Sequence, residues 1–262
     1  MSKKTFFIFW NKFVYGGHLL SLGASGITYT VTSFLNLKNS WILLAISYFL
    51  SQIVYSFDHT KDATNDAKKR RTSKTALSIY FLFLISAGIL SKSLFLFLIS
   101  VAIVSFGFFY TLFLKGLTKK IPFLKNIFVA LVWAISPIVI VMVYYGLPFA
   151  KSLLFLFLFI FARWFLNTSF FDVKDVKEDK QKNLKTMPII FGEKKSFTIF
   201  HIINVISFLP LTIALYFKIL PVYATGLYLF YFFSFWYLLG AKKNKKNLAF
   251  FSYVVADGEY IL

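Results

Sequence analysis

Residues 151–179 read KSLLFLFLFIFARWFLNTSFFDVKDVKED, an apolar run followed directly by an acidic cluster. The run at 151–171 is long enough to cross a hydrocarbon core of about 30 Å as a helix. Similar runs recur along the chain, which is 58% hydrophobic and only 15% charged, whereas a soluble domain is about 25% charged. The sequence therefore predicts an all-α, polytopic membrane protein with a single domain over residues 1–262.

Eight apolar stretches and a weaker ninth are predicted to span the membrane, as a bundle of about nine helices around a central cavity. The predicted spans are 14–36, 41–57, 76–91, 94–114, 123–146, 151–171, 197–217, 220–240 and, with a weaker pattern, 248–262. Pro137 and Pro210 fall inside two spans and are expected to kink them, because proline lacks an amide proton. Two acidic segments end spans two and six, which suggests two four-helix halves that face each other across the cavity.

The basic residues are concentrated in alternate connections between the spans. Of the 29 Lys and Arg residues, 24 lie in the amino terminus and in the loops after spans two, four, six and eight. Because basic loops remain on the cytoplasmic side, the amino terminus and both acidic segments are predicted to face the cytoplasm from the cell membrane. The same distribution explains the net charge of +19 without nucleic acid as a partner.

Seven of the ten acidic residues lie in these two short segments. The carboxylates at helical spacing are Asp58, Asp62 and Asp66 in the first segment and Asp172, Asp175 and Asp179 in the second. At about 100° per residue, either spacing places three carboxylates along one face of a helix. Carboxylates that lie this close repel one another unless cations neutralise them, so both sets are predicted to be metal ligands of one divided site.

The surroundings of the carboxylates indicate the ligand. Mg²⁺ favours a few carboxylates together with phosphate oxygens and water, and nearby Lys or Arg side chains neutralise the remaining charge of a bridging diphosphate. Apolar and aromatic residues behind the carboxylates suit a hydrocarbon tail. The predicted substrate therefore has a diphosphate head and a long tail, and Ser51 and Tyr55, which precede Asp58 on its helix face, are expected to line its pocket.

Three stretches resemble a known family. YSFDHTKD at 55–62, with Asp66, resembles the first aspartate-rich motif of the UbiA-type intramembrane prenyltransferases. DVKDVKED at 172–179, followed by KTMPIIFG at 185–192, resembles the second motif, and IPFLKN at 121–126 resembles the family after its fourth span. The family's first motif begins Asn-Asp, where this chain has Asp58-His59, and Asp58 takes the ligand role by helical spacing, one turn before Asp62.

The resemblance implies Mg²⁺-dependent transfer of a prenyl group from a prenyl diphosphate to an acceptor, either aromatic or another lipid or quinone precursor, within the lipid bilayer. It implies that Asp62 and Asp175 are catalytic. The residues expected to bind the diphosphate are Arg70, Lys119, Lys125 and Asn126. Membrane topology alone would also place basic residues in these loops.

Arg163 is a basic residue that lies well inside the predicted span 151–171. An unpaired charge is costly there and a functional role is the default hypothesis, so Arg163 is predicted to be catalytic. The alternative is a structural pairing with Asn167 or with a carboxylate of another helix, and an ideal helix places Arg163 about 180° from Asp172. Asp257 and Glu259 receive no predicted role.

The alternative function is a cation-coupled membrane transporter that uses the aspartate clusters as ion sites. A transporter is expected to carry acidic residues near the middle of the bilayer, often beside broken helices. The acidic segments of this chain follow the ends of spans instead. This position favours the prenyltransferase.

Overall fold

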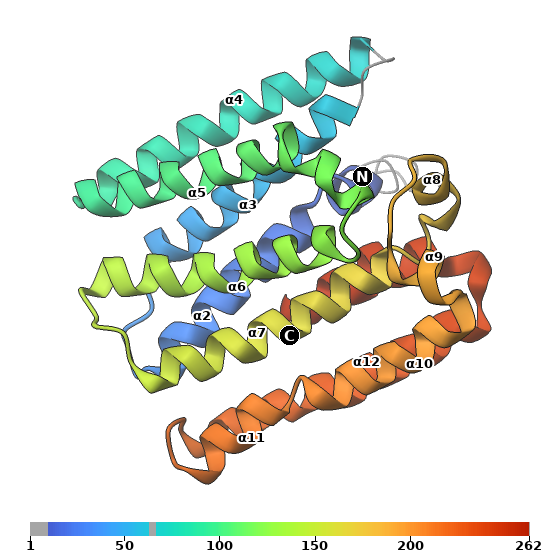
Figure 1. Ribbon diagram of the computed structural model, residues 1–262. Coiled ribbons are helices and arrows are strands. Elements are labelled where there is room, and N and C mark those ends of the chain that lie inside the picture. Colours follow the sequence, from blue (N-terminus) through green and yellow to red (C-terminus); the bar gives the residue numbers. More distant parts are fainter. Residues whose placement is uncertain (1–9, 63–66, 262) are drawn as a thin grey trace.

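The computed structural model describes residues 10–62 and 67–261, and for residues 59–62, 67–73 and 115 it describes the backbone alone. The axes of the long helices are roughly aligned in one bundle (Figure 1). No strand occurs in the described ranges. The long helices are α2 (His18–Phe34), α3 (Trp41–Asp62), α4 (Ala67–Leu90), α5 (Leu94–Leu112), α6 (Leu124–Tyr145), α7 (Lys151–Phe171), α10 (Glu193–Ile206) and α12 (Leu229–Lys243). The all-α prediction is confirmed.

Short helical pieces connect and end the bundle. They are η1 (Leu114–Lys119), α8 (Val176–Gln181), α9 (Met187–Phe191), α11 (Leu209–Tyr216), η2 (Val222–Tyr228), η3 (Lys245–Asn247), α13 (Leu248–Phe250), η4 (Phe251–Ala256) and η5 (Glu259–Ile261). We refer to residues 251–261 as the C-terminal segment. It is a π-helix followed by a single 3₁₀ turn.

Six stretches in the described ranges are long and apolar enough to cross a membrane: Trp41–Asp58, Leu94–Leu112, Leu124–Tyr145, Lys151–Phe171, Glu193–Tyr216 and Val222–Lys243. A seventh, Lys74–Leu90, is apolar but shorter. Helix α2 has 17 residues, which is at the lower limit for a span. The chain is thus a multi-pass helical membrane protein, and the predicted count of nine spans stays a prediction.

The predicted spans agree best with the structure at α6 and α7, and α6 continues through Pro137 within one residue of the predicted bounds 123–146. Helix α7 has the predicted bounds of 151–171. The predicted span 197–217 instead divides into α10 and α11, and Pro210 lies in the first turn of α11, where its missing amide proton costs least. The predicted span 220–240 begins with the 3₁₀ helix η2, directly after Pro221.

Hydroxyl groups join α2 to α3 in the core. The Ser21 hydroxyl donates to Ser51 Oγ at 2.9 Å, and Thr28 and Ser47 share a hydrogen bond of 2.8 Å. Small and hydroxylated residues allow close helix contact inside a membrane, where lipid offers no hydrophobic contrast. These hydrogen bonds hold α2 and α3 together.

The described parts of both acidic segments lie at the same end of the bundle. In Figure 1, the end of α3, the start of α4, and helices α8 and α9 gather on the right. The connections between α4 and α5 and between α6 and α7 lie at the opposite end. The first acidic segment is therefore on the same side as the second, as the topology prediction requires.

Candidate active site

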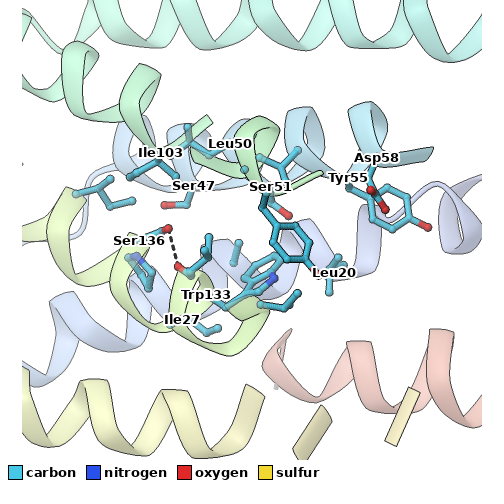
Figure 2. Close-up of a pocket in the computed structure, with 18 of the residues that line it drawn as sticks. Leu20, Ile27, Ser47, Leu50, Ser51, Tyr55, Asp58, Ile103, Trp133 and Ser136 are labelled. Carbon is cyan, nitrogen blue, oxygen red and sulfur yellow. Dashed lines mark hydrogen bonds between the residues drawn. The ribbon is translucent and has the colours of Figure 1, made fainter. Parts of the chain in front are cut away.

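An apolar cavity of about 230 Å³ lies among α2, α3, α5 and α6. On α3 its lining residues are Ser47, Leu50, Ser51, Val54, Tyr55 and Asp58, which is one helix face by their spacing. Asp58 and Tyr55 lie at one end of the cavity, and Ser136 and Ile103 lie toward the other (Figure 2). The prediction that Ser51 and Tyr55 line the pocket is confirmed.

The cavity differs from the predicted one in its position. Its described lining residues come from the first half of the chain and from α6, and none comes from α7 or from the helices after it. This cavity thus lies within the first half of the bundle, and the expected arrangement of two four-helix halves across a central cavity stays a prediction. Helix α7 packs behind α6, and the second acidic segment reaches the site only at the end of the bundle.

Asp172 is the first carboxylate of the second acidic segment. It caps the end of α7 and is fully buried. Lys125 Nζ lies 2.9 Å from its Oδ1, and Asn126 Nδ2 donates to its Oδ2 at 2.8 Å. Both partners are in the first turn of α6. The structure thus brings together three residues predicted for the site and attaches the start of α6 to the end of α7.

The backbone holds this corner in place. Phe123 precedes α6 with a φ of 59°, and its amide donates to the Lys185 carbonyl at 3.1 Å. Lys185 follows α8, so the loop after the second acidic segment is tied to the start of α6. Lys125 and Asn126 are therefore held between two parts of one motif.

Asp175 and Asp179 complete the second segment. Asp175 accepts a hydrogen bond of 2.6 Å from Lys174 Nζ. Asp179 is buried, and its Oδ2 finds no hydrogen-bond partner among the described residues. Burial, with repulsion from Asp172 and Asp175, raises the pKa of Asp179 to about 6, although Lys125 partly opposes this. The cluster therefore carries negative charge that the protein does not fully neutralise.

Tyr110 of α5 connects this cluster with the cavity. It lines the cavity beside Asp58, and it interacts electrostatically with Lys125, Asp58 and Asp172. Its ring stacks on Phe128 of α6 with a centroid distance of 4.2 Å. Asp58 and Asp172 thus both lie within electrostatic range of the Tyr110 hydroxyl.

The remaining predicted site residues have different positions. The side chains of Asp62, Asp66 and Arg70 lie outside the described residues. Lys119 ends η1 and is exposed. The predicted roles of these four residues stay predictions.

The family of the chain is identified by comparison with known proteins. A model of the UbiA prenyltransferase family matches residues 19–256. The chain belongs to the UbiA prenyltransferase family. It is therefore a prenyltransferase enzyme of the membrane. No curated protein matches the chain.

One solved structure supports the fold of this prenyltransferase independently. It is described as a digeranylgeranylglyceryl phosphate synthase in membranes, and it matches with a TM-score of 0.56 at 13% sequence identity. The match covers 95% of this chain and 96% of the other. At this identity the likeness concerns the fold alone.

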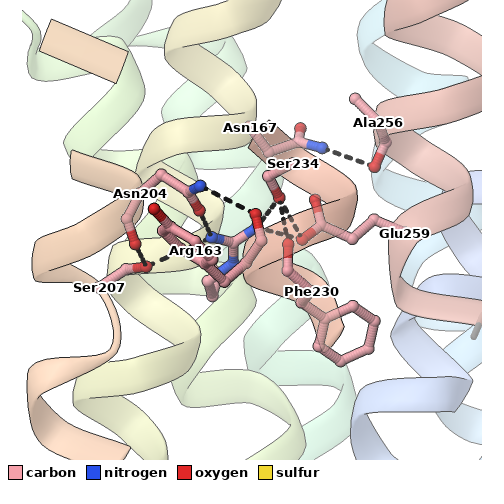
Figure 3. A network of polar contacts seen from close by, with 9 residues as sticks. Arg163, Asn167, Asn204, Ser207, Phe230, Ser234, Ala256 and Glu259 are labelled. Carbon is pink, nitrogen blue, oxygen red and sulfur yellow. Dashed lines mark hydrogen bonds and ion pairs between the residues drawn. The ribbon is translucent and has the colours of Figure 1, made fainter. Parts of the chain in front are cut away.

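Arg163 of the prenyltransferase is held in a buried polar network (Figure 3). Its guanidinium forms an ion pair with Glu259 and donates to Ser234, and both side chains of the pair are almost fully buried. It also donates to Asn204 Oδ1 at 2.5 Å and to Ser207 Oγ at 3.3 Å. These contacts join α7 to the C-terminal segment and to the helices that follow α9. They support the structural alternative for Arg163, and its catalytic role stays a prediction.

Two residues were missed in the sequence: Tyr110, which lines the cavity, and Glu259, which pairs with Arg163. Tyr110 has no charge and lies in an apolar run, so no pattern separates it from its neighbours. Glu259 received no role, although it is the carboxylate on another element that the structural alternative for Arg163 required. The sequence signal for Glu259 was that an acidic residue occurs within the weakly apolar stretch 248–262.

The residues of the second segment fit a divalent cation chemically. Their oxygen donors suit Mg²⁺, and the unpartnered Asp179 Oδ2 with its raised pKa marks a place where positive charge would be stabilising. Within the described residues, no group of three acidic or histidine side chains is arranged closely enough to hold a metal ion. Asp62 and Asp66, whose side chains are not described, are the further carboxylates available.

Proposed function

We propose that this prenyltransferase breaks the allylic C–O bond of a prenyl diphosphate with the help of Mg²⁺ and joins the prenyl carbon to an aromatic or lipid-type acceptor. The main observation behind this proposal is the apolar cavity that has Asp58 of the first acidic segment at one end. Tyr110, which lines the same cavity, also lies within electrostatic range of Asp172 of the second segment. A polar end on an apolar cavity suits a substrate with a charged head and a hydrocarbon tail.

Each residue of the site has a role in this proposal. Mg²⁺ would be held by Asp172, Asp175 and Asp179 together with Asp58, Asp62 and Asp66, where it would stabilise negative charge on the departing diphosphate. Lys125 and Asn126 orient Asp172 from α6. The Lys125 ammonium, which is about one-third exposed, is also placed to neutralise a phosphate oxygen. Arg70 and Lys119 are proposed to bind the diphosphate from the neighbouring loops.

In the proposed reaction one C–O bond breaks and one bond to the acceptor forms. The C–O bond breaks with both electrons on the diphosphate oxygen, which leaves an allylic cation. An electron pair of the acceptor forms the new bond to this carbon, and the acceptor then releases a proton. Tyr55 and Tyr110 both line the cavity, and their rings would stabilise the cation by cation–π attraction. The apolar walls limit its capture by water.

Orientation in the membrane is part of the proposal. The excess of Lys and Arg in one set of connections supports placing the amino terminus and both acidic segments in the cytoplasm. The diphosphate would then enter from the cytoplasm, and its tail would lie along the cavity within the bilayer.

The test is prenyl transfer by the protein in proteoliposomes. Labelled prenyl diphosphates of several lengths are supplied with Mg²⁺ and a panel of aromatic and lipid acceptors. We expect a labelled prenyl product and release of one diphosphate per product, with both signals lost when EDTA removes the divalent cation. Cation flux across the same proteoliposomes without diphosphate release would contradict the proposal and favour a transporter.

A further inference from the structure

Three aromatic rings connect the cavity wall with the C-terminal segment. Trp133 lines the cavity from α6 and stacks on Trp164 of α7, with ring centroids 4.2 Å apart and an interplanar angle of 12°. Trp164 is almost fully buried. It also stacks on Tyr260, with a centroid distance of 4.6 Å and an angle of 7°. Tyr260 is thus linked to the cavity through two ring contacts, although it is not among the cavity-lining residues.

Tyr260 is fixed from two sides. The residue before it, Glu259, forms the buried ion pair with Arg163 of α7. On the other side is α2, where a Cβ built at Gly26 would lie 2.1 Å from the Tyr260 carbonyl oxygen and one at Gly23 would lie 3.1 Å from Tyr260 Cβ. Only glycine allows this close an approach at Gly26. The C-terminal segment is therefore wedged between α2 and α7 and holds the Tyr260 ring against Trp164.

Trp133 lies about halfway along the cavity. It follows Lys125 by eight residues of α6, which corresponds to a distance of about 12 Å along the helix. Ile140, the most distant lining residue on α6, lies about 10 Å beyond Trp133 by the same rise. A hydrocarbon tail that extends from the Asp58 end of the cavity to Ile140 must therefore pass the Trp133 ring.

We propose that Tyr260 is a positioning residue that holds Trp133 in the cavity wall and thereby limits the length of the prenyl chain that the enzyme accepts. This inference rests on the proposed function, because it assumes that a prenyl tail occupies the cavity. Loss of the Tyr260 ring allows Trp164, and with it Trp133, to move away from the cavity. The width at the midpoint then increases, and longer chains gain affinity relative to shorter ones.

The test measures binding, so it does not depend on turnover or on the acceptor. Unreactive prenyl thiolodiphosphates of two, three and four isoprene units are titrated in the presence of Mg²⁺ into the full-length protein in lipid nanodiscs. The variants are Tyr260→Leu and Tyr260→Met, which remove the ring, and Tyr260→Phe, which keeps it. Two ring-removing variants are used so that the result does not depend on the folding of either one. The quantity compared is the ratio of the dissociation constants for the longest and shortest analogues.

We expect Tyr260→Leu and Tyr260→Met to shift this ratio by about fivefold in favour of the longest analogue, which is the equilibrium factor for one aromatic pair. Tyr260→Phe should keep the wild-type ratio. In a Trp133→Ala background, Tyr260→Leu should leave the ratio unchanged, because its effect passes through the Trp133 ring.

Two results would overturn the inference alone: an unchanged ratio in both ring-removing variants, or the same shift in the Trp133→Ala background. A purely structural role would weaken all three analogues equally. A wild-type protein that binds none of the analogues would instead contradict the proposed function, so the two failures are distinguishable.

Discussion

Replacing Glu259 by Gln should destabilise the protein, because it leaves the Arg163 guanidinium buried without its counter-charge. The two side chains are 2% and 1% exposed, so solvent cannot compensate for the loss. Removal of one partner of a buried ion pair costs about 3–5 kcal/mol. Asn204, Ser207 and Ser234 still accept hydrogen bonds from Arg163, so we expect a value at the lower end, about 3 kcal/mol.

The assay is thermal unfolding of the purified protein in detergent. For a chain of this size, 1 kcal/mol corresponds to a shift in Tm of about 2–4 °C, so Glu259→Gln should lower the apparent Tm by about 6–12 °C. The matched control is Glu193→Gln, which removes the partly exposed ion pair with Lys245 at 2.8 Å. A pair of this kind contributes at most about 1 kcal/mol, so the control should shift Tm by no more than about 4 °C.

The double variant Arg163→Met with Glu259→Leu separates a structural role of Arg163 from a catalytic one. Replacing both partners by apolar residues is often neutral for stability, so the double variant should recover most of the lost Tm. It should also keep prenyl transfer, because Arg163 touches no residue of the second acidic segment in the described structure. A Glu259→Gln variant as stable as the control would refute the reasoning. Recovered stability with abolished transfer would instead establish Arg163 as catalytic.

Three further predictions concern the site and the topology. Asn126→Leu removes a hydrogen bond to Asp172 and should lower Mg²⁺ affinity by about 10–100-fold, the usual effect of losing a residue that orients a metal ligand, in a titration followed by diphosphate-analogue binding. The folded-state pKa of Asp179, about 6, is above its ordinary value of 3.8, so the native metal-free protein binds more protons than the unfolded chain between about pH 4 and 6. Its stability should therefore fall as pH rises through this window, and Asp179→Asn should flatten that part of a Tm-against-pH profile; an unchanged slope would contradict the prediction. Because the chain contains no cysteine, Glu178→Cys should react with an impermeant maleimide only from the cytoplasmic side and Lys218→Cys only from the other, and the reverse pattern would contradict the orientation.

The sequence was a good guide to helices bounded by charged loops. The apolar run of α7 ends directly before Asp172 and was predicted with its observed bounds. It was a poorer guide at Pro210, because hydropathy continues across this residue while the backbone hydrogen bonds do not, whereas α6 continues through Pro137. The break between α10 and α11 follows from this difference.

Pairings between distant residues were beyond the sequence for a physical reason. Asp172, Lys125 and Asn126 were each predicted for the site, yet their contacts join residues 46 and 47 positions apart and depend on how α6 packs against α7. Arg163 and Glu259 are 96 positions apart. A buried charge predicts that a partner exists, but only the packing of the C-terminal segment identifies that partner.

The central claim is that the two acidic segments form one site, and the most direct measurement is prenyl transfer after one carboxylate is removed from each. The double variant Asp62→Ala with Asp175→Ala is compared in proteoliposomes with Glu178→Ala, which removes an exposed carboxylate of the same segment. The account predicts that the double variant loses transfer while Glu178→Ala keeps the wild-type rate. Full turnover by the double variant would contradict it.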